Sequence, residues 1–461
     1  MRTIAIIGAG QAGLLAGHAL LKHGYSVTLF SDKSPQDFLT KARPTGAAGR
    51  FNMALEFERE LGLNHWDNEV PWATYAHVTL CPALNNRLMT VCGRLEKPGC
   101  AIDLRLQSHR WMLDLEKKGG KVIIEKVTVN RLDEIANEHD LTIVAAGRED
   151  IQNVFERDEA RSTYSKPPRK LAAVGVTGNA MGFEGAPGIP VKFNLFPEYG
   201  ECFWVPWYHK DHQQAWMLLV EAKEGGPLDR FDGVNSGQQV VDITRQIIKE
   251  MMPWDYAWTK NMKLADEHAW LAGSFVPGVK KPVGKLPSGR IVMPLGDTAI
   301  SLDPIAGQGA NCGNKMVRNL IECIVAHKKN PFDAEWMNAT FEKFWERHHW
   351  IDKLSTLFLE PMTDAGKEFL IASYGSTGRP DDDSVQQLIA DAFANNFDDP
   401  ARLTYALYDV KEARRVIEQY THRHWLRTKL KGLLRIGKGQ VRQKMGLDPH
   451  HPSTAPFQHP V

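Results

Sequence analysis

The sequence has 461 residues, 43% hydrophobic and 24% charged, and its 56 basic and 55 acidic residues leave a formal net charge of +1. This composition is typical of a soluble protein with more than one domain, excludes a largely disordered chain, and indicates no nucleic acid or other polyanionic partner. The six cysteines show no CxxC spacing and no run of 18 apolar residues occurs, so we expect a cytoplasmic protein without disulfides, metal sites or membrane-spanning helices.

The first 32 residues predict a nucleotide-binding unit. TIAII (residues 3–7) reads as a buried strand, a helix follows, and SVTLF (residues 26–30) reads as a second strand. In the intervening GAGQAG, the first glycine permits a tight turn, the second lets backbone approach a pyrophosphate, and the third lets the helix pack on the strand. Inside a complete strand–helix–strand unit, this motif predicts a dinucleotide site rather than a structural turn. The predicted contacts are Gly8, Ala9, Gly10, Gln11, Ala12 and Gly13.

The end of the second strand and the loop after it supply further candidates. Ser31 or Asp32 stands where such sites place the residue that holds the ribose hydroxyls. Arg43 lies in a polar, glycine-containing loop at residues 33–50. It either meets a phosphate or flavin edge or is a solvated loop arginine, and the sequence leaves both interpretations open.

Two helices are expected before residue 120. The first covers residues 52–63, with Asn52 as its N-terminal cap. The second covers residues 103–118, and Arg105 near its start suits an anionic or phosphate partner. KVIIEKVTV then reads as a strand. DLTIVAAG is another buried strand, and its small final residues Ala146 and Gly147 would let a flavin-adenine group pass close to the backbone.

The region from about residue 170 to 285 carries strand candidates KLAAVGV, ECFWVPWY and QAWMLLVEA, followed by a helix. It has no second GxGxxG, so we expect it to hold substrate rather than a second nucleotide. Phe203, Trp204 and Trp207 make one strand dense in aromatic side chains. Either these side chains pack a sheet, or one face of that strand lines an apolar pocket.

The second informative stretch is GRIVMPLGD, a buried strand that ends at Asp297, whose carboxylate can accept from a ribityl hydroxyl. Pro304 stiffens the next loop, and Gly307 and Gly309 expose backbone amides at the start of a helix, which suits a flavin ring or a diphosphate. Two glycine-rich stretches in one domain favour FAD over NAD. The predicted contacts here are Gly296, Asp297, Pro304, Gly307, Gln308, Gly309, Ala310 and Asn311.

From residue 331 onward the pattern is helical. Eleven Lys and Arg residues against two Glu give residues 411–444 about nine net positive charges, with leucines at near-helical spacing among them. This segment is either a packed helix with a solvated basic face or a helix that contacts a membrane surface or a partner.

GAGQAG and GDTAISLDPIAGQGAN together resemble FAD-dependent aromatic monooxygenases with the p-hydroxybenzoate hydroxylase-like fold, and within them the styrene and indole monooxygenases. ERELGLNHW and AIDLRLQSHRWMLDLEKKGG are also similar to this group, and the resemblance covers roughly residues 1–330. Ile300 stands where single-component hydroxylases have histidine, and Ala146-Gly147 stands where they have the Asp-Gly pair linked to FAD and NADPH binding. These departures favour an enzyme that receives FADH2 from a separate NAD(P)H:flavin reductase.

The resemblance implies a monooxygenase that uses FADH2 and O2 on a C=C bond of a small aromatic such as indole or styrene. It implies that Asn311 orients the reacting oxygen or the flavin edge and that Asn52 lines the site. It also suggests a homodimer. The alternatives are a flavin-dependent halogenase and a non-catalytic escort protein. Halogenases carry a WxWxIP motif, which WVPW at residues 204–207 of this chain does not match. The substrate contacts expected are Phe203, Trp204, Trp207 and Pro304.

The expected fold class is α/β, with a Rossmann-type, glutathione-reductase-2-like FAD domain, an inserted β-sheet substrate domain and a C-terminal helical region. The expected boundaries are residues 1–169 and 286–330 for the FAD domain, 170–285 for the substrate domain and 331–461 for the helical region.

Overall fold

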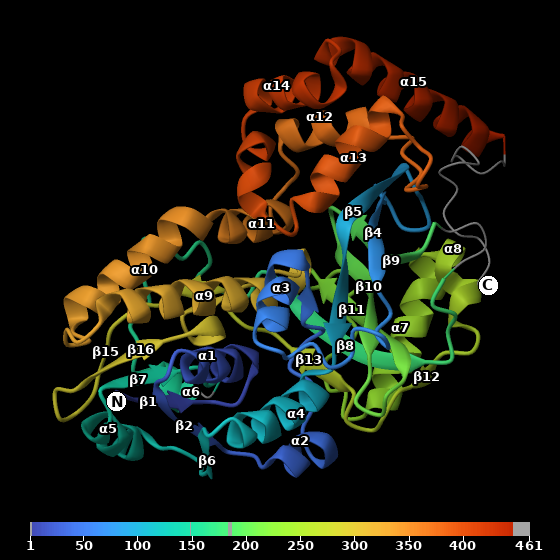
Figure 1. The fold of residues 1–461 in the computed structure, drawn as a ribbon. Coiled ribbons are helices and arrows are strands. Elements are labelled where there is room, and N and C mark those ends of the chain that lie inside the picture. Colours follow the sequence, from blue (N-terminus) through green and yellow to red (C-terminus); the bar gives the residue numbers. More distant parts are fainter. Residues whose placement is uncertain (1, 148, 183–186, 446–461) are drawn as a thin grey trace. The chain divides into compact units, whose positions relative to one another are not determined.

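A computed structural model describes residues 2–147, 149–182 and 187–445 (Figure 1). Two compact units divide the chain. Unit 1 consists of Met1–Asp67, Ile102–Pro167 and Phe275–Asp352, and unit 2 consists of Asn68–Ala101, Pro168–Ser274 and Lys353–Val461. None of the described helices combines the length and the hydropathy needed to cross a membrane.

Unit 1 is built on a sheet with strand order β15-β16-β7-β1-β2-β6. Strand β1 pairs in parallel with β2 and β7, and β16 and β6 extend the parallel set on either side. The β-branched run Ile4, Ile6 and Ile7 is buried because helices cover the faces of a parallel sheet. The strands of unit 1 are β1 (Thr3–Ile7), β2 (Ser26–Ser31), β3 (Gly49–Arg50), β6 (Lys121–Ile124), β7 (Leu141–Val144), β14 (Gly278–Val279), β15 (Gly284–Lys285), β16 (Ile291–Pro294) and β17 (Ile300–Ser301).

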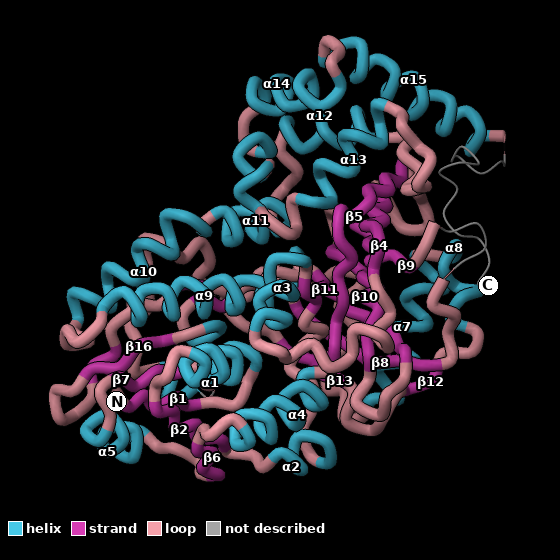
Figure 2. The backbone as a smooth tube through the Cα atoms, in the orientation of Figure 1, coloured by secondary structure: helices cyan, strands magenta, loops and turns pink. Residues whose placement is uncertain are grey.

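Helices complete unit 1, as the ribbon and tube views show (Figures 1 and 2). Leu14 and Leu20 of α1, Trp111 and Leu115 of α4 and Val317 of α9 share one buried apolar cluster with the β1 side chains. The helices are α1 (Gln11–Lys22), α2 (Pro35–Thr40), α3 (Asn52–Glu60), α4 (Leu104–Lys117), α5 (Val129–Glu138), α6 (Glu149–Gln152), α9 (Gly309–His327) and α10 (Ala334–His348).

Unit 2 contains a larger, mainly antiparallel sheet with the order β12-β8-β11-β10-β9-β4-β5, and β13 also pairs with β8. Strand β4 runs parallel to β9. Val240 and Ile247 of α7 join Trp204 and Trp216 in one buried cluster, so α7 covers one face. The strands are β4 (Ala73–Leu80), β5 (Met89–Ile102), β8 (Lys170–Thr177), β9 (Ile189–Phe196), β10 (Gly200–Tyr208), β11 (Gln214–Ala222), β12 (Lys263–Leu264) and β13 (Trp270–Gly273).

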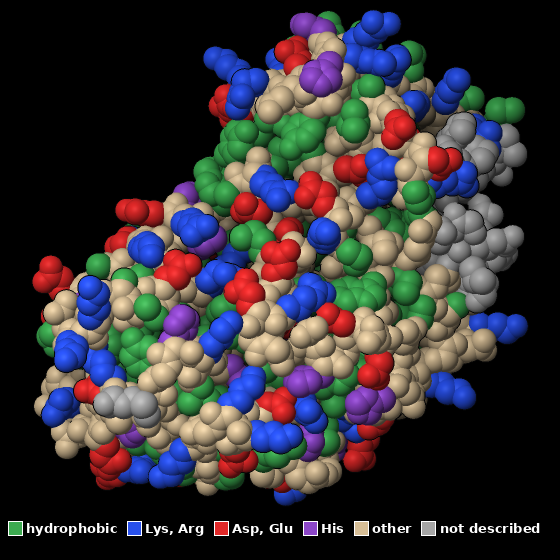
Figure 3. Space-filling view, viewed as in Figure 1, with side chains coloured by type: hydrophobic (Ala, Val, Ile, Leu, Met, Phe, Trp, Pro, Cys, Tyr) green, Lys and Arg blue, Asp and Glu red, His purple; other side chains and the backbone are tan. Residues whose placement is uncertain are grey.

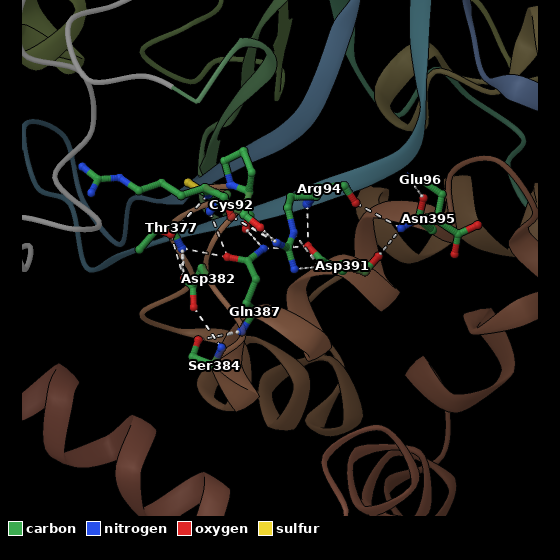
Figure 4. A network of polar contacts seen from close by, with 12 residues as sticks. Cys92, Arg94, Glu96, Thr377, Asp382, Ser384, Gln387, Asp391 and Asn395 are labelled. Atoms are coloured by element: carbon green, nitrogen blue, oxygen red, sulfur yellow. Dashed lines mark hydrogen bonds and ion pairs between the residues drawn. The ribbon is translucent and has the colours of Figure 1, made fainter.

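The helices of unit 2 are α7 (Gly237–Met251), α8 (Pro253–Tyr256), α12 (Asp364–Ser373), α13 (Val385–Asn395), α14 (Val410–Thr421) and α15 (Trp425–Lys444), and α11 (Trp350–Leu359) crosses the boundary between the units. A polar network fixes α13 to β5 (Figure 4). Arg94 donates from Nε (2.9 Å) and Nη2 (2.7 Å) to Asp391 Oδ2, and Gln387 Nε2 donates to the Cys92 carbonyl at 3.0 Å. Backbone contact is close there, because a Cβ on Gly93 would lie 2.1 Å from the Ala390 oxygen.

The structure differs from the sequence expectations at several places. The compact units do not follow the expected boundaries, because residues 68–101 pair with the substrate-domain strands instead of staying with residues 1–169. The expected strand KVIIEKVTV ends at Ile124, and its last residue opens α5, capped by Thr128. Asn52 is not a helix cap: Phe51 occupies the N-cap position of α3, and the Asn52 amide donates to Glu56 instead, at 2.9 Å.

Candidate functional site

In the glycine turn between β1 and α1, two glycines are packed against backbone and one is open to solvent. Gly8 has φ +115°, and a Cβ there would lie 2.3 Å from the Ala145 carbonyl oxygen. A Cβ on Gly13 would lie 2.1 Å from the Gly8 oxygen, so both glycines are required by backbone packing. A Cβ on Gly10 would meet nothing within 4 Å, and Gly10 is exposed at the N-cap of α1, where no side chain caps the helix. The surface at Gly10 is therefore open to a ligand that needs close backbone approach.

The second glycine-rich stretch contacts this turn, although about 300 residues separate the two in the sequence. Gly296 has φ +62°, and a Cβ there would lie 2.8 Å from the Ala12 Cβ. Gln11 Nε2 donates to the Ala310 carbonyl at 3.4 Å. The N-terminus of α9, like that of α1, has no side-chain cap. Two helix N-termini with uncapped backbone N–H groups thus lie in one region, which favours a phosphate or another anionic group.

Asp297 lies beside the start of α9. Its Oδ1 is 3.8 Å from the position of a Cβ on Gly309. The residue as a whole is exposed, yet protein groups around its carboxyl desolvate it enough to raise its pKa above the usual range. The next residue, Thr298, donates its hydroxyl to the Ala146 carbonyl at 3.0 Å, which ties the end of β16 to the end of β7. The carboxyl ends of these parallel strands are where ligands bind in open α/β sheets.

The loop before α9 is held in a fixed shape. Pro304 begins a short 3-10 turn, Pro304–Ala306, which the Asp303 side chain caps by accepting from the Ile305 N–H at 3.1 Å. Gly307 follows in the left-handed region at φ +60° and is exposed. Its exposed backbone faces solvent at the point where the sequence predicts contact with a flavin.

Asn311 is completely buried, and its amide is occupied by backbone partners. Its Oδ1 accepts from the Phe51 N–H at 2.9 Å, and its Nδ2 donates to the carbonyls of Gly49 (2.9 Å) and Gly307 (2.8 Å). Both amide hydrogens are therefore used within the protein. Asn311 thus joins the segment before α3 to the Gly307 turn.

The candidate ribose contacts differ in accessibility. Ser31 is buried, and its hydroxyl donates to the Lys33 carbonyl at 2.7 Å. Asp32 is exposed and pairs with the Lys33 ammonium at 2.7 Å, so of the two it is the more accessible to a ribose. Arg43 is exposed on its loop.

Arg105 is buried and forms an ion pair with Asp103, the N-cap residue of its own helix, at 2.7 Å from Nη2. The structure thus places Arg105 against a carboxylate, which offsets the charge predicted to meet an anion. Asn52 is half-buried at the start of α3.

The sequence analysis missed Arg50, which is 1% exposed. Its Nε lies 3.5 Å from the buried Glu58 carboxylate, and its Nη1 donates to Gln107 Oε1. Asn314 also donates to Glu58, at 3.1 Å, and burial raises the Glu58 pKa despite the opposing effect of Arg50. The sequence signal for Arg50 was its place between the GAAG segment and Phe51, where a buried position can be expected. A buried arginine needs a paired partner, because burying an unpaired charge costs free energy.

The aromatic strand β10 is closed on both faces. The Trp204 ring stacks on Trp258 at 4.1 Å between centroids and meets Trp216 edge-on. Phe203, on the opposite face, meets Phe193 at 5.0 Å. Trp207 packs so closely that a Cβ on Gly175 would lie 2.6 Å from its ring. This packing favours an aromatic core around Trp204, whose indole N–H, like that of Trp207, has no hydrogen-bond partner among the described residues. Among those same residues no group of His, Cys, Asp and Glu could hold a metal ion.

Comparison with known proteins gives consistent matches. Residues 147–257 match the family model described as "Styrene monooxygenase A putative substrate binding domain". Styrene monooxygenase StyA of Pseudomonas fluorescens is 25% identical over 409 residues, which cover 87% of this chain and 94% of that protein, and StyA of a Pseudomonas species matches with the same identity and coverage.

Solved structures agree on the fold. Halogenase PltM superposes with a TM-score of 0.60 at 12% identity and covers 96% of each chain. The flavin-dependent halogenase CmlS gives 0.59 at 14% identity (88% of this chain, 77% of that one), and 2-methyl-3-hydroxypyridine-5-carboxylic acid oxygenase gives 0.52 at 16% (87% and 98%). The predicted fold class is confirmed, and the matches together indicate a styrene monooxygenase-like, FAD-dependent monooxygenase.

Proposed function

We propose that this styrene monooxygenase-like enzyme is the oxygenase component of a two-component system, which takes FADH2 from a separate NAD(P)H:flavin reductase and uses O2 to oxidise a small apolar aromatic such as styrene or indole. The similarity to styrene monooxygenases over 87% of the chain supports the reaction class. The single structural observation that carries the proposal is the meeting of the Gly10 turn and the Gly296–Asp297 turn in unit 1.

The residues at this meeting point fit FAD. The pyrophosphate would lie against the open backbone at Gly10, where two uncapped helix N-termini supply N–H groups and positive dipole ends. The ribityl hydroxyls would donate to Asp297, and Asp32 would accept from the adenosine ribose. The Gly307 turn would contact the flavin ring. Gln11, Ala12 and Ala310 bring the two stretches together rather than contacting the nucleotide through side chains.

Bound FADH2 supplies the oxygen-activating chemistry, and the protein contributes binding, orientation and exclusion of water. Asn311 maintains the Gly307 turn against the segment before α3. Pro304, beside the Gly307 turn of unit 1, remains a proposed substrate contact, whereas Phe203, Trp204 and Trp207 are packed within the sheet of unit 2 and are not proposed as contacts. An apolar substrate pocket discriminates between substrates that differ by one methylene by only about 1–3 kcal/mol, so we expect several small aromatics to react.

Ala146 and Ile300 support an external source of electrons. Isoleucine and alanine carry no polar side chain at the positions where single-component hydroxylases have one. Ile300 is buried in β17, and Ala146 takes part only through its carbonyl, which accepts from Thr298. These two departures weaken the case for reduction by NADPH on this polypeptide and support FADH2 supplied by a separate reductase.

The experiment supplies the purified enzyme with FADH2 from a flavin reductase and with O2, and offers styrene and indole separately. We expect styrene epoxide and coloured indoxyl-derived products. NADPH with oxidised FAD and no reductase serves as the control and should give no product. Absence of product from both aromatics under a measured FADH2 supply contradicts the proposal. A halogenated product that depends on added chloride or bromide supports the halogenase alternative. FAD titration by fluorescence separates the monooxygenase and the halogenase, which bind FAD, from a non-catalytic escort protein. Sedimentation velocity tests the expected homodimer.

A further inference from the structure

Helix α15 (Trp425–Lys444) packs on α12 through small residues. Thr428, Gly432 and Gly439 are buried and lie on one face of the helix. A Cβ on Gly432 would lie 2.0 Å from the Ile371 carbonyl oxygen, so the two helix backbones are in direct contact there. Arg435 adds a hydrogen bond to the Tyr374 carbonyl at 2.8 Å. One face of α15 is therefore fully used within unit 2.

The opposite face carries an exposed apolar stripe. With 100° per residue, its members cluster within about 60° of Leu430, whereas the packed face lies about 160–200° away. Leu434 and Met445 are 71% and 69% exposed. Single exposed leucines are common on protein surfaces, but a row along a whole helix is not. The stripe consists of Leu426, Leu430, Leu433, Leu434, Val441 and Met445.

Cations border this stripe. Arg427, Lys431 and Lys438 lie along one edge, and Lys444 lies near the other. All four are exposed, and none forms an ion pair with the part of the chain that the structure describes. The helix contains no acidic residue. Blue and green side chains stand side by side over this part of the molecule (Figure 3).

We propose that α15 binds the surface of a membrane containing anionic phospholipids, with the leucine stripe in the interfacial region and the bordering cations at the headgroups. An apolar stripe edged by Lys and Arg, on a helix too polar to span a bilayer, is the pattern of an interfacial helix. A flat surface contacts a helix along one continuous stripe, which matches the full 20-residue length of α15. Uncompensated positive charge with no acid makes anionic lipid the complementary partner. This inference does not depend on the proposed function.

The test is co-sedimentation of the full chain with vesicles of phosphatidylcholine alone or with 30% phosphatidylserine. We expect binding to the anionic vesicles, weakened by high salt, and little binding to the neutral ones. Two variants separate the contributions: Leu430→Gln with Leu434→Gln, and Lys431→Gln with Lys438→Gln. Each lysine near an anionic surface contributes about fivefold, so the lysine pair should lose roughly 25-fold in affinity. Leu113→Gln on α4, an exposed leucine outside α15 (40%), is the matched control and should bind like the unmodified protein.

All substituted side chains are exposed, so the variants should keep the melting temperature and the circular dichroism spectrum of the parent. Failure of the parent to bind anionic vesicles overturns the proposal, and so does equal binding by the parent and both double variants. A dimer that dissociates on the leucine substitutions, without vesicle binding, would assign the stripe to a second copy of the chain instead. Lysine-dependent binding to an acidic flavin reductase, without vesicle binding, would assign it to that partner.

Discussion

Gly10 and Gly13 stand three residues apart in one motif, yet the structure predicts opposite consequences for their substitution by alanine. At Gly10, φ is −77° and a Cβ would meet nothing within 4 Å, so Gly10→Ala should change the free energy of unfolding by less than about 1 kcal/mol. At Gly13, the new Cβ would lie 2.1 Å from the Gly8 oxygen, and relief requires backbone movement. Gly13→Ala should therefore destabilise the protein by about 3 kcal/mol, the upper end of the usual cost of overpacking.

Gly10→Ala should weaken FAD binding even though it leaves the free energy of unfolding nearly unchanged. A methyl group there occupies the space that the proposed pyrophosphate contact needs and interrupts one charge-assisted hydrogen bond, which contributes about 2–3 kcal/mol. The dissociation constant for FAD should therefore rise about 30- to 150-fold while the fold stays intact.

The assay combines chemical denaturation of the apoprotein with a fluorescence titration of FAD. Gly437→Ala is the matched control, because a Cβ on Gly437 also meets nothing within 4 Å and this glycine lies in α15 of unit 2. Unchanged FAD affinity in Gly10→Ala would refute the placement of the pyrophosphate. Loss of stability comparable to that of Gly13→Ala would refute the conclusion that packing leaves Gly10 open.

Further outcomes test other parts of the structure. Asn311→Ala removes three buried hydrogen bonds and should cost about 3 kcal/mol of stability in denaturant melts, with weaker FAD binding, whereas an unchanged melt would contradict the positioning role. Burial lowers the pKa of His18 from 6.5 to about 4, so stability should be lost as pH falls from 6.5 toward 4, by about 3 kcal/mol in total, and pH melts of His18→Gln should lack that slope. Lys192→Met leaves the buried Asp255 carboxylate unpaired and should cost about 3–5 kcal/mol, most of which Lys192→Met with Asp255→Leu should restore; equal melts of both variants would contradict this.

The nucleotide unit could be predicted from the sequence because its signals are local. A β-branched apolar run, three glycines at fixed spacing and a helical apolar pattern occur within 30 residues, and each agrees with the others. The aromatic strand β10 was predictable as a strand for the same reason. Its environment was not, because alternation assigns side chains to two faces without showing what covers each face.

The pairing of β4 with β9 could not be predicted. These strands run parallel and are more than 100 residues apart, and no turn chemistry links them. Strand β9 itself, IPVKFNLF, carries Lys192 at a position that is completely buried, so its polar residues conceal the pattern of a core strand. The ion pair with Asp255 of α8 explains this burial, and that partner lies 63 residues away.

Asn311 shows why a motif identifies a site more reliably than it identifies the role of each residue. The sequence placed this amide at a helix start next to exposed glycine backbone, where direct contact with the cofactor or with oxygen is the natural expectation. The buried amide instead joins Gly49 and Phe51 to Gly307, residues more than 250 positions apart in the chain. Its substitution should therefore disturb the flavin site through the position of the Gly307 turn. Aspartate can keep the bond from the Phe51 N–H, but it places a buried, unpaired carboxylate oxygen against the carbonyls of Gly49 and Gly307, so at neutral pH Asn311→Asp should destabilise the protein at least as much as Asn311→Ala.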